Sequence, residues 1–294
     1  MPEGTMPRDA GWRGKLAAGA LGFSVFSVVW FVIAALGSKW GLWGWQFGLG
    51  TMTMKIGPIL LMMAAAVSLV AIIAGLTKSP RSKPVILGIA GLLVSGLALG
   101  RIMGFGAQAG ALPPLHDIQT DWSDPIMFSE MMLDARTAGG ALNPVEEAPV
   151  LSVPASAQER WPNVDGRLVS EVQEEAEFNP ETMSEPEDAP YPTIEPLILE
   201  AEMAAVAAAV QDLVRARNWT MVTADAENGV FEATETSGWF GFKDDVAIHL
   251  TATEDGGTRV DMRSVSRVGL SDLGANATRV SEFLKDLRSD VISG

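Results

Sequence analysis

The chain has 294 residues, no cysteine and a formal net charge of −15, so disulfides, thiolate catalysis and cysteine-ligated metal sites are excluded. Its charge is uneven: nine basic and two acidic residues precede Ala111 (net +7), whereas twelve basic and 34 acidic residues follow from there (net −22). Such an acidic part repels phosphate backbones, which argues against nucleic acid as a partner.

Three apolar stretches occupy the first part of the chain, at residues 16–36, 57–76 and 84–100, the last continuing toward Phe105. Each approaches the ~20 residues that a helix needs to cross a ~30 Å hydrocarbon core. No acidic or basic residue interrupts them before Arg101. We therefore predict three transmembrane helices within residues 16–106, and the lipid bilayer as a partner. Because transporters usually carry ionisable residues at mid-membrane, a transporter is the weaker interpretation.

The flanking charges predict the orientation. Cationic residues gather in the tail 1–15 and in the loop between the second and third stretches, and such residues prefer the cytoplasm. They are Arg8, Arg13, Lys15, Lys78, Arg81 and Lys83. We predict a cytoplasmic tail at 1–15, a bacterial inner-membrane location and a periplasmic domain from residue 111 onward. Residues 35–37 also resemble a signal-peptidase site, so cleavage of the first stretch stays an alternative.

The part after the membrane stretches divides into three segments. Residues 111–134 are expected to start the soluble domain, with a strand at 115–120 after the proline pair. Residues 135–190 are acidic and rich in proline without apolar periodicity, which predicts a disordered insertion. Residues 191–294 are expected to form the main α+β domain.

Periodicity in residues 191–294 predicts helix, four strands, helix. Apolar residues recur at helical spacing from Leu199 to Leu213, in a helix expected from Pro196 to Arg217. Strands are predicted at 220–224, 230–236, 245–253 and 258–268, and a last helix at 276–291. The predicted fold class is an α-helical membrane anchor plus an α+β soluble domain, in which an antiparallel β-meander packs on two helices.

Side-chain alternation constrains the last predicted hairpin. Leu250, Val260 and Met262 must share the core face, and a three-residue loop at 255–257 satisfies this requirement. It places Leu250 opposite Met262, Asp245 opposite Arg267 and His249 opposite Arg263, so that the other face is a strip of charge.

Several segments resemble the uncharacterised bacterial and plastid family named domain of unknown function 1499. They are residues 112–121 (LPPLHDIQTD), Asp124-Pro125, residues 191–197 (YPTIEPL), residues 241–246 (GFKDDV) and residues 263–276 (RSVSRVGLSDLGAN). The resemblance covers about residues 113–289 apart from the acidic insertion. It supports the domain assignment and implies no reaction, ligand or cofactor.

The densest polar cluster lies in the last strands and helix. It comprises Asp244, Asp245, Arg263, Ser264, Ser266, Arg267, Ser271, Asp272, Asn276 and Arg279. One interpretation is an anion-binding pocket, in which arginine forks and the helix N-terminus hold a carboxylate or phosphate. The other, which we favour, is a set of structural ion pairs and helix caps, in which Asp245 holds Arg267 and the last helix is capped by Ser271, Asp272 or Asn276.

No catalytic, metal or cofactor site is predicted. His116 and His249 lack a short metal-ligand spacing, and no nucleophile–base motif is present. Trp239 and Phe240 lie at an apolar loop tip that could contact lipid or a hydrophobic ligand, with Trp239 the better candidate for exposure.

The sequence therefore favours a non-enzymatic, membrane-anchored binding or assembly module of the cell envelope. Its expected partner is another membrane or envelope protein or a lipid-like ligand. The alternative is an envelope enzyme that acts on an anionic or lipid-like substrate through the Asp/Arg cluster.

Overall fold

The computed structural model describes residues 10–179, 182–186 and 189–293. Residues 1–9 of the predicted cytoplasmic tail, and residues 180–181 and 187–188 of the predicted insertion, lie outside the described residues. The chain divides into two compact units. The helical unit comprises residues up to Gln108 together with Gly238–Gly241, and the α+β unit comprises Ala109–Ser237 and Phe242–Gly294.

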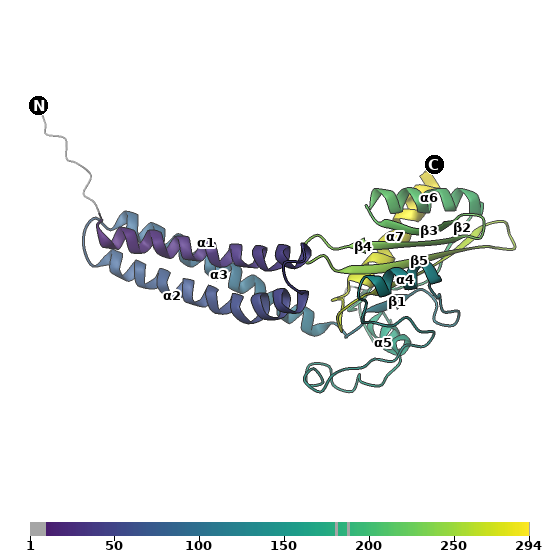
Figure 1. Ribbon diagram of the computed structural model, residues 1–294, viewed down its shortest axis with the longest axis horizontal. Coiled ribbons are helices and arrows are strands. Elements are labelled where there is room, and N and C mark those ends of the chain that lie inside the picture. The colour runs from purple at the N-terminus through teal and green to yellow at the C-terminus, as the bar shows by residue number, and fades with distance from the viewer. Residues whose placement is uncertain (1–9, 180–181, 187–188, 294) are drawn as a thin grey trace, which may run out of the picture. The chain divides into compact units, whose positions relative to one another are not determined.

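The helical unit contains three long apolar helices (Figure 1). Their elements are α1 (Trp12–Lys39), η1 (Gln46–Ile56), which continues directly into α2 (Gly57–Leu76), and α3 (Ser82–Ala111). Each of the three is long and apolar enough to cross a membrane, which confirms the three predicted stretches. The π-helical turns of η1 were not predicted; there the Thr53 hydroxyl donates to the Gly48 carbonyl, five residues earlier, at 2.9 Å.

Polar contacts join α1 to α2. Arg13, at the start of α1, donates to the carbonyls of Gly75 (3.4 Å), Lys78 and Ser79 (3.2 Å), where α2 ends. These carbonyls have no partner inside a helix, and a cation is favourable at a helix C-terminus. Arg13, in the first turn of α1, thus caps the end of α2.

The α+β unit contains an antiparallel six-stranded sheet in the order β1-β6-β5-β4-β3, with β2 also paired to β6. The strands are β1 (Asp117–Gln119), β2 (Leu197–Leu199), β3 (Thr220–Asp225), β4 (Val230–Thr236), β5 (Lys243–Ala252) and β6 (Thr258–Ser266). The helices are α4 (Glu130–Ala138), α5 (Val169–Ala176), α6 (Met203–Ala216) and α7 (Ala275–Ser293). Strands β3 to β6 form the predicted meander.

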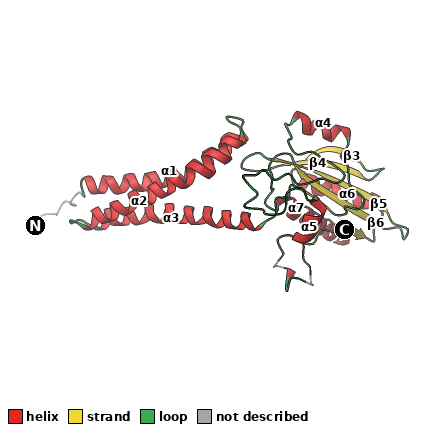
Figure 2. Cartoon of the chain, turned by 90° about the horizontal axis from the view of Figure 1, so that it is seen from below, coloured by secondary structure: helices red, strands yellow, loops and turns green. Residues whose placement is uncertain are grey.

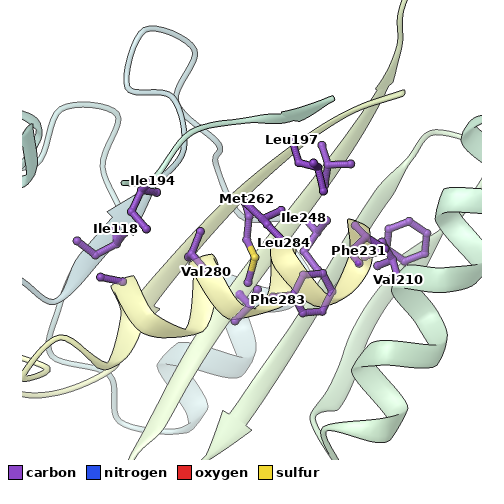
Figure 3. Packing of buried hydrophobic residues seen from close by; sticks show 14 of the residues in the cluster. Ile118, Ile194, Leu197, Val210, Phe231, Ile248, Met262, Val280, Phe283 and Leu284 are labelled. Atoms are coloured by element: carbon purple, nitrogen blue, oxygen red, sulfur yellow. The ribbon is translucent and has the colours of Figure 1, made fainter. Parts of the chain in front are cut away.

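The main core lies between one face of the sheet and helices α6 and α7 (Figure 3). Ile248 and Met262 on neighbouring strands meet Phe283 of α7, and Phe231 meets Val210 of α6; all five are buried. This confirms the α+β fold with a meander packed on two helices.

The other face of the sheet is covered by the segment 126–146, which we call the covering segment. Its helix α4 lies on the side of the sheet opposite to α7 (Figure 2). A small apolar cluster joins Met132 of α4 and Phe128 to Ala247 and Val265 of the sheet. The remaining space on this face is filled by charged side chains.

The register of the last hairpin differs from the prediction. Leu250 pairs with Val260 rather than Met262, and His249 pairs with Asp261 rather than Arg263. The loop spans five residues, 253–257, because the Thr253 hydroxyl accepts from the N–H of Gly257 at 3.0 Å and closes the turn. The shift is two residues, so the predicted facing of the side chains is preserved.

The first helix of the main domain begins later than predicted. Residues 197–199 form β2, in which Leu197 pairs with Val260 and Leu199 with Thr258. The Thr258 hydroxyl then donates to the Ala201 carbonyl at 2.7 Å, and α6 begins at Met203. The spacing of Leu199 from the other buried residues fits a helix and a strand equally well. Residues 197–199 form a strand because they pair with the edge of β6.

The prediction of disorder is wrong over residues 150–176. Leu151, Val169 and Val172 are buried in the main core. The side-chain amide of Gln173 in α5 donates to the Gln119 carbonyl at 2.9 Å and accepts from the Gln119 N–H at 3.3 Å, so it satisfies the outer edge of β1. The segment supplies too few apolar residues for a periodic pattern, and it folds on a core that other segments build.

Candidate functional site

The sheet separates the predicted polar cluster into two groups. Successive residues of a strand point to opposite faces. Asp245, Arg263 and Arg267 lie under the covering segment, whereas Asp244 and Ser266 face α7. The predicted residues therefore do not form one site.

Asp245 is the centre of the first group and is fully buried. Its carboxylate accepts from Arg267 Nε and Nη2, both at 2.8 Å, from Arg136 Nη1 at 2.7 Å and from the Thr234 hydroxyl at 2.6 Å. The predicted contact with Arg267 is present, although the cross-strand partner of Asp245 is Val265. Burial lowers the pKa of Arg136, and the neighbouring Asp245 charge opposes this effect.

Arg263 is also fully buried and holds β1 and two points of the covering segment. It binds Asp117 through two hydrogen bonds, Nε at 2.9 Å and Nη2 at 2.6 Å. Nη1 donates to the Ile126 carbonyl at 2.6 Å, and Nη2 also donates to the Glu146 carbonyl at 2.8 Å. The Trp122 ring lies 5.3 Å from the guanidinium carbon. The arrangement fastens the covering segment to the sheet and closes it over the charges.

Replacing Gly139 by alanine is expected to destabilise the domain by about 1–3 kcal/mol, in the range of overpacked sites. A Cβ at Gly139 would lie 2.1 Å from Arg267 Nη1, and that guanidinium is pinned by Asp245. Urea unfolding of the full chain measures the change. Gly238→Ala is the control, since its Cβ would meet nothing within 4 Å. Equal stability of the two variants would contradict the prediction.

The second group surrounds Arg279 of α7. Its guanidinium donates to Asp244 Oδ2 at 2.6 Å, to Glu235 and to the side-chain oxygen of Asn276. The amide of Asn276 donates to the Ser266 hydroxyl at 3.0 Å. Arg279 and Asn276 are buried, so these contacts pack α7 on the strand ends rather than present open donors.

Asp272 caps α7, as the structural interpretation predicts. Its two carboxylate oxygens accept from the N–H groups of Gly274 at 2.7 Å and Asn276 at 2.8 Å. Burial raises the pKa of Asp272 to about 6, although the two N–H donors favour the charged form.

The raised pKa of Asp272 predicts a pH dependence. The folded chain holds the proton more tightly than the unfolded chain, so this contribution to stability is complete below about pH 3.8 and is lost as the pH rises through about 6. We expect the stability advantage of the wild type over Asp272→Asn to shrink between pH 4 and pH 7. Urea unfolding at both pH values measures it, and an advantage that grows with pH would refute the assignment.

Four participants were not in the predicted set: Asp117, Arg136, Thr234 and Glu235. Thr234 could have been found, because it lies directly opposite Asp245 in the β4–β5 pair. Arg136 lies in the segment predicted to be disordered, and no spacing links it to Asp245, 109 residues away.

Residues 117–287 match the model of the family described as "Protein of unknown function (DUF1499)". The matched residues are more than half of the chain. The chain belongs to the DUF1499 family. The match begins at the first residue of β1 and ends within α7, and it confirms the resemblance predicted from the sequence. No curated protein matches the chain.

A hollow of about 330 Å³ opens on the α7 side of the DUF1499 domain. It is lined by Arg217, Trp219, Glu235, Leu273, Gly274, Ala275, Thr278, Arg279 and Glu282. Arg217 lies over the Trp219 and Phe283 rings, at 5.5 and 5.3 Å, and donates to Asp286 at 2.5 Å. The lining carries two cationic and two anionic residues. The volume of the hollow is at the lower end of the range for ligand pockets. Because its positive and negative charges are balanced, the lining does not favour an anionic ligand.

His116 borders the second group, because its carbonyl accepts from the side-chain amide of Asn276 at 3.1 Å. Burial lowers the pKa of His116 and of His249. Among the residues that the structure describes, no group of three acidic or histidine side chains is arranged to hold a metal ion. Trp239 is 61% exposed, as predicted, whereas Phe240 of the same loop is partly buried.

Proposed function

We propose that this DUF1499 protein is a membrane-anchored, non-enzymatic binding or assembly module of the cell envelope. In this proposal the N-terminus is cytoplasmic and the DUF1499 domain lies in the periplasm of a bacterium, anchored in the inner membrane. Its partner is another envelope protein or a lipid-like molecule.

The burial of the Asp/Arg cluster supports this proposal most directly. Asp245 and Arg263 have no exposed surface, and Arg267 is 5% exposed. Their hydrogen bonds are directed to other buried side chains and to backbone carbonyls of the covering segment. A substrate would have to displace that segment to reach them, so the cluster suits a rigid scaffold better than a catalytic centre.

The net charge of the chain supports a role outside the cytosol. Nine of the 21 basic residues precede Ala111, in the part with the apolar helices, whereas the residues from Ala111 onward carry a net charge of −22. Retention of positive residues on the cytoplasmic side favours export of the acidic domain.

A reporter fused after Gly294 tests the sidedness: a fusion with a periplasm-dependent phosphatase is expected to be active, and a matched cytosol-dependent fluorescent fusion inactive. Purification of the full chain in mild detergent, with mass spectrometry of bound proteins and lipids, tests the binding role. Hydrolysis of simple esters or phosphoesters that Arg279→Lys abolishes while the variant stays folded would overturn the non-enzymatic role.

A further inference from the structure

The β4–β5 loop is an uncharged tip on an acidic domain. Residues 237–242 read Ser-Gly-Trp-Phe-Gly-Phe, and Trp239 is 61% exposed. The base of the loop is closed by two hydrogen bonds, from the Ser237 N–H to the Phe242 carbonyl at 2.8 Å and from the Phe242 N–H to the Ser237 hydroxyl at 2.9 Å. The loop therefore has a defined shape that presents an indole to its surroundings.

The sheet register places this loop at the end where the chain enters from the third apolar helix. Only residues 112–116 separate α3 from β1. The carbonyl of His116 accepts from the Ser266 N–H at 2.8 Å, and Ser266 pairs with Asp244, near the start of β5 just after the loop. The entry of the chain and the apolar loop thus share one end of the sheet.

The short connection keeps this end of the sheet close to the last residue of α3. Six Cα–Cα steps from Ala111 to Asp117 reach at most about 20 Å. The turns at the opposite end of the sheet, residues 226–229 and 253–257, contain Glu227, Glu254 and Asp255 and no aromatic residue. The apolar tip therefore lies at the tethered end, and the described turns of the other end are suited to water.

We propose that the loop 237–242 places Trp239 in the headgroup region of the bilayer and so anchors the DUF1499 domain to the membrane surface. An indole combines a large apolar ring with one N–H donor, which favours the boundary between hydrocarbon and water. Lys243 follows the loop, is exposed and can pair with lipid phosphates. The contact requires the three apolar helices to hold the chain in the bilayer. It is the same on whichever side of the membrane the domain lies.

The absence of cysteine permits a direct depth measurement. Gly238→Cys places a nitroxide label beside Trp239 without removing the indole, at a position where a Cβ meets nothing within 4 Å. Asp255→Cys in the exposed β5–β6 turn is the matched control. The full chain is reconstituted in vesicles of phosphatidylcholine and phosphatidylglycerol. Collision of each label with dissolved oxygen and with a water-soluble nickel chelate is then measured.

We expect a higher oxygen-to-nickel collision ratio at position 238 than at position 255, and loss of this difference in Gly238→Cys/Trp239→Ser. Equal ratios at both positions would overturn the proposal. A label at 238 shielded from both reagents would also overturn it, because the loop would then be covered by protein. If Trp239→Ser left the oxygen-to-nickel collision ratio at position 238 unchanged, the indole would not be the anchor. None of these outcomes alters the reporter or co-purification results that test the proposed function.

Discussion

Replacing Asp245 by asparagine is expected to lower the free energy of unfolding by about 3–5 kcal/mol, the usual cost of removing one partner from a buried ion pair. The fully buried carboxylate is shared by Arg136 and Arg267, whose side chains are only 4% and 6% exposed. Asparagine removes the negative charge and leaves two guanidinium groups without it. Urea unfolding of the full chain in detergent micelles, followed by proteolysis of the α+β unit, measures the loss.

Asp255→Asn is the control for Asp245→Asn. Asp255 lies in the same hairpin but is exposed in its turn, so its substitution is expected to change stability by no more than about 0.5 kcal/mol. If Asp245→Asn were as stable as the control, the two arginines would have to be charge-compensated in another way. The assignment of a structural role to Asp245 and its partners would then be wrong.

Replacing Arg263 by methionine is expected to cost a similar amount, about 3–5 kcal/mol, because it leaves the Asp117 carboxylate buried without its partner. The double variant Arg263→Met/Asp117→Asn is expected to be more stable than Arg263→Met alone. Its recovery is partial, since methionine cannot donate to the carbonyls of Ile126 and Glu146, and each unpaired buried carbonyl costs about 1–3 kcal/mol.

A double-mutant cycle separates these contributions. Residues within one ion pair are expected to show a coupling of about 0.5–3 kcal/mol in the free energy of unfolding. If the loss in the double variant equalled the sum of the losses in Arg263→Met and Asp117→Asn, Arg263 would act through its carbonyl contacts alone. Arg215→Met, in a pair with Asp212 whose side chains are 69% and 74% exposed, is the surface control and is expected to show little change.

A structural role of the buried charges and a membrane-contact role of the loop 237–242 predict different effects of mutation. Variants of Asp245 or Arg263 should reduce the amount of folded protein, whereas variants of Trp239 should leave folding intact and change only the membrane contact. The two groups of residues therefore give separable effects in the same chain.

Parts of the fold follow from local pattern. The long apolar runs gave the three helices because length and hydropathy are properties of consecutive residues. The strands β3 to β6 and the helix α7 followed from alternation and helical spacing, and Asp272 was one of three residues, with Ser271 and Asn276, that the sequence offered as a cap for that helix. The contact between Asp245 and Arg267 was also anticipated, although its predicted register was two residues off.

The sequence by itself determined the apolar anchor, the acidic α+β domain and the facing of its strands, because each depends on neighbours in the chain. Only the tertiary structure decided which charges are sealed. Arg263 is buried by contacts with residues 117, 126 and 146, and Asp245 meets Arg136 across 109 positions. Whether a charged side chain reaches water depends on which distant segment covers it, and periodicity within one strand contains no information about that cover.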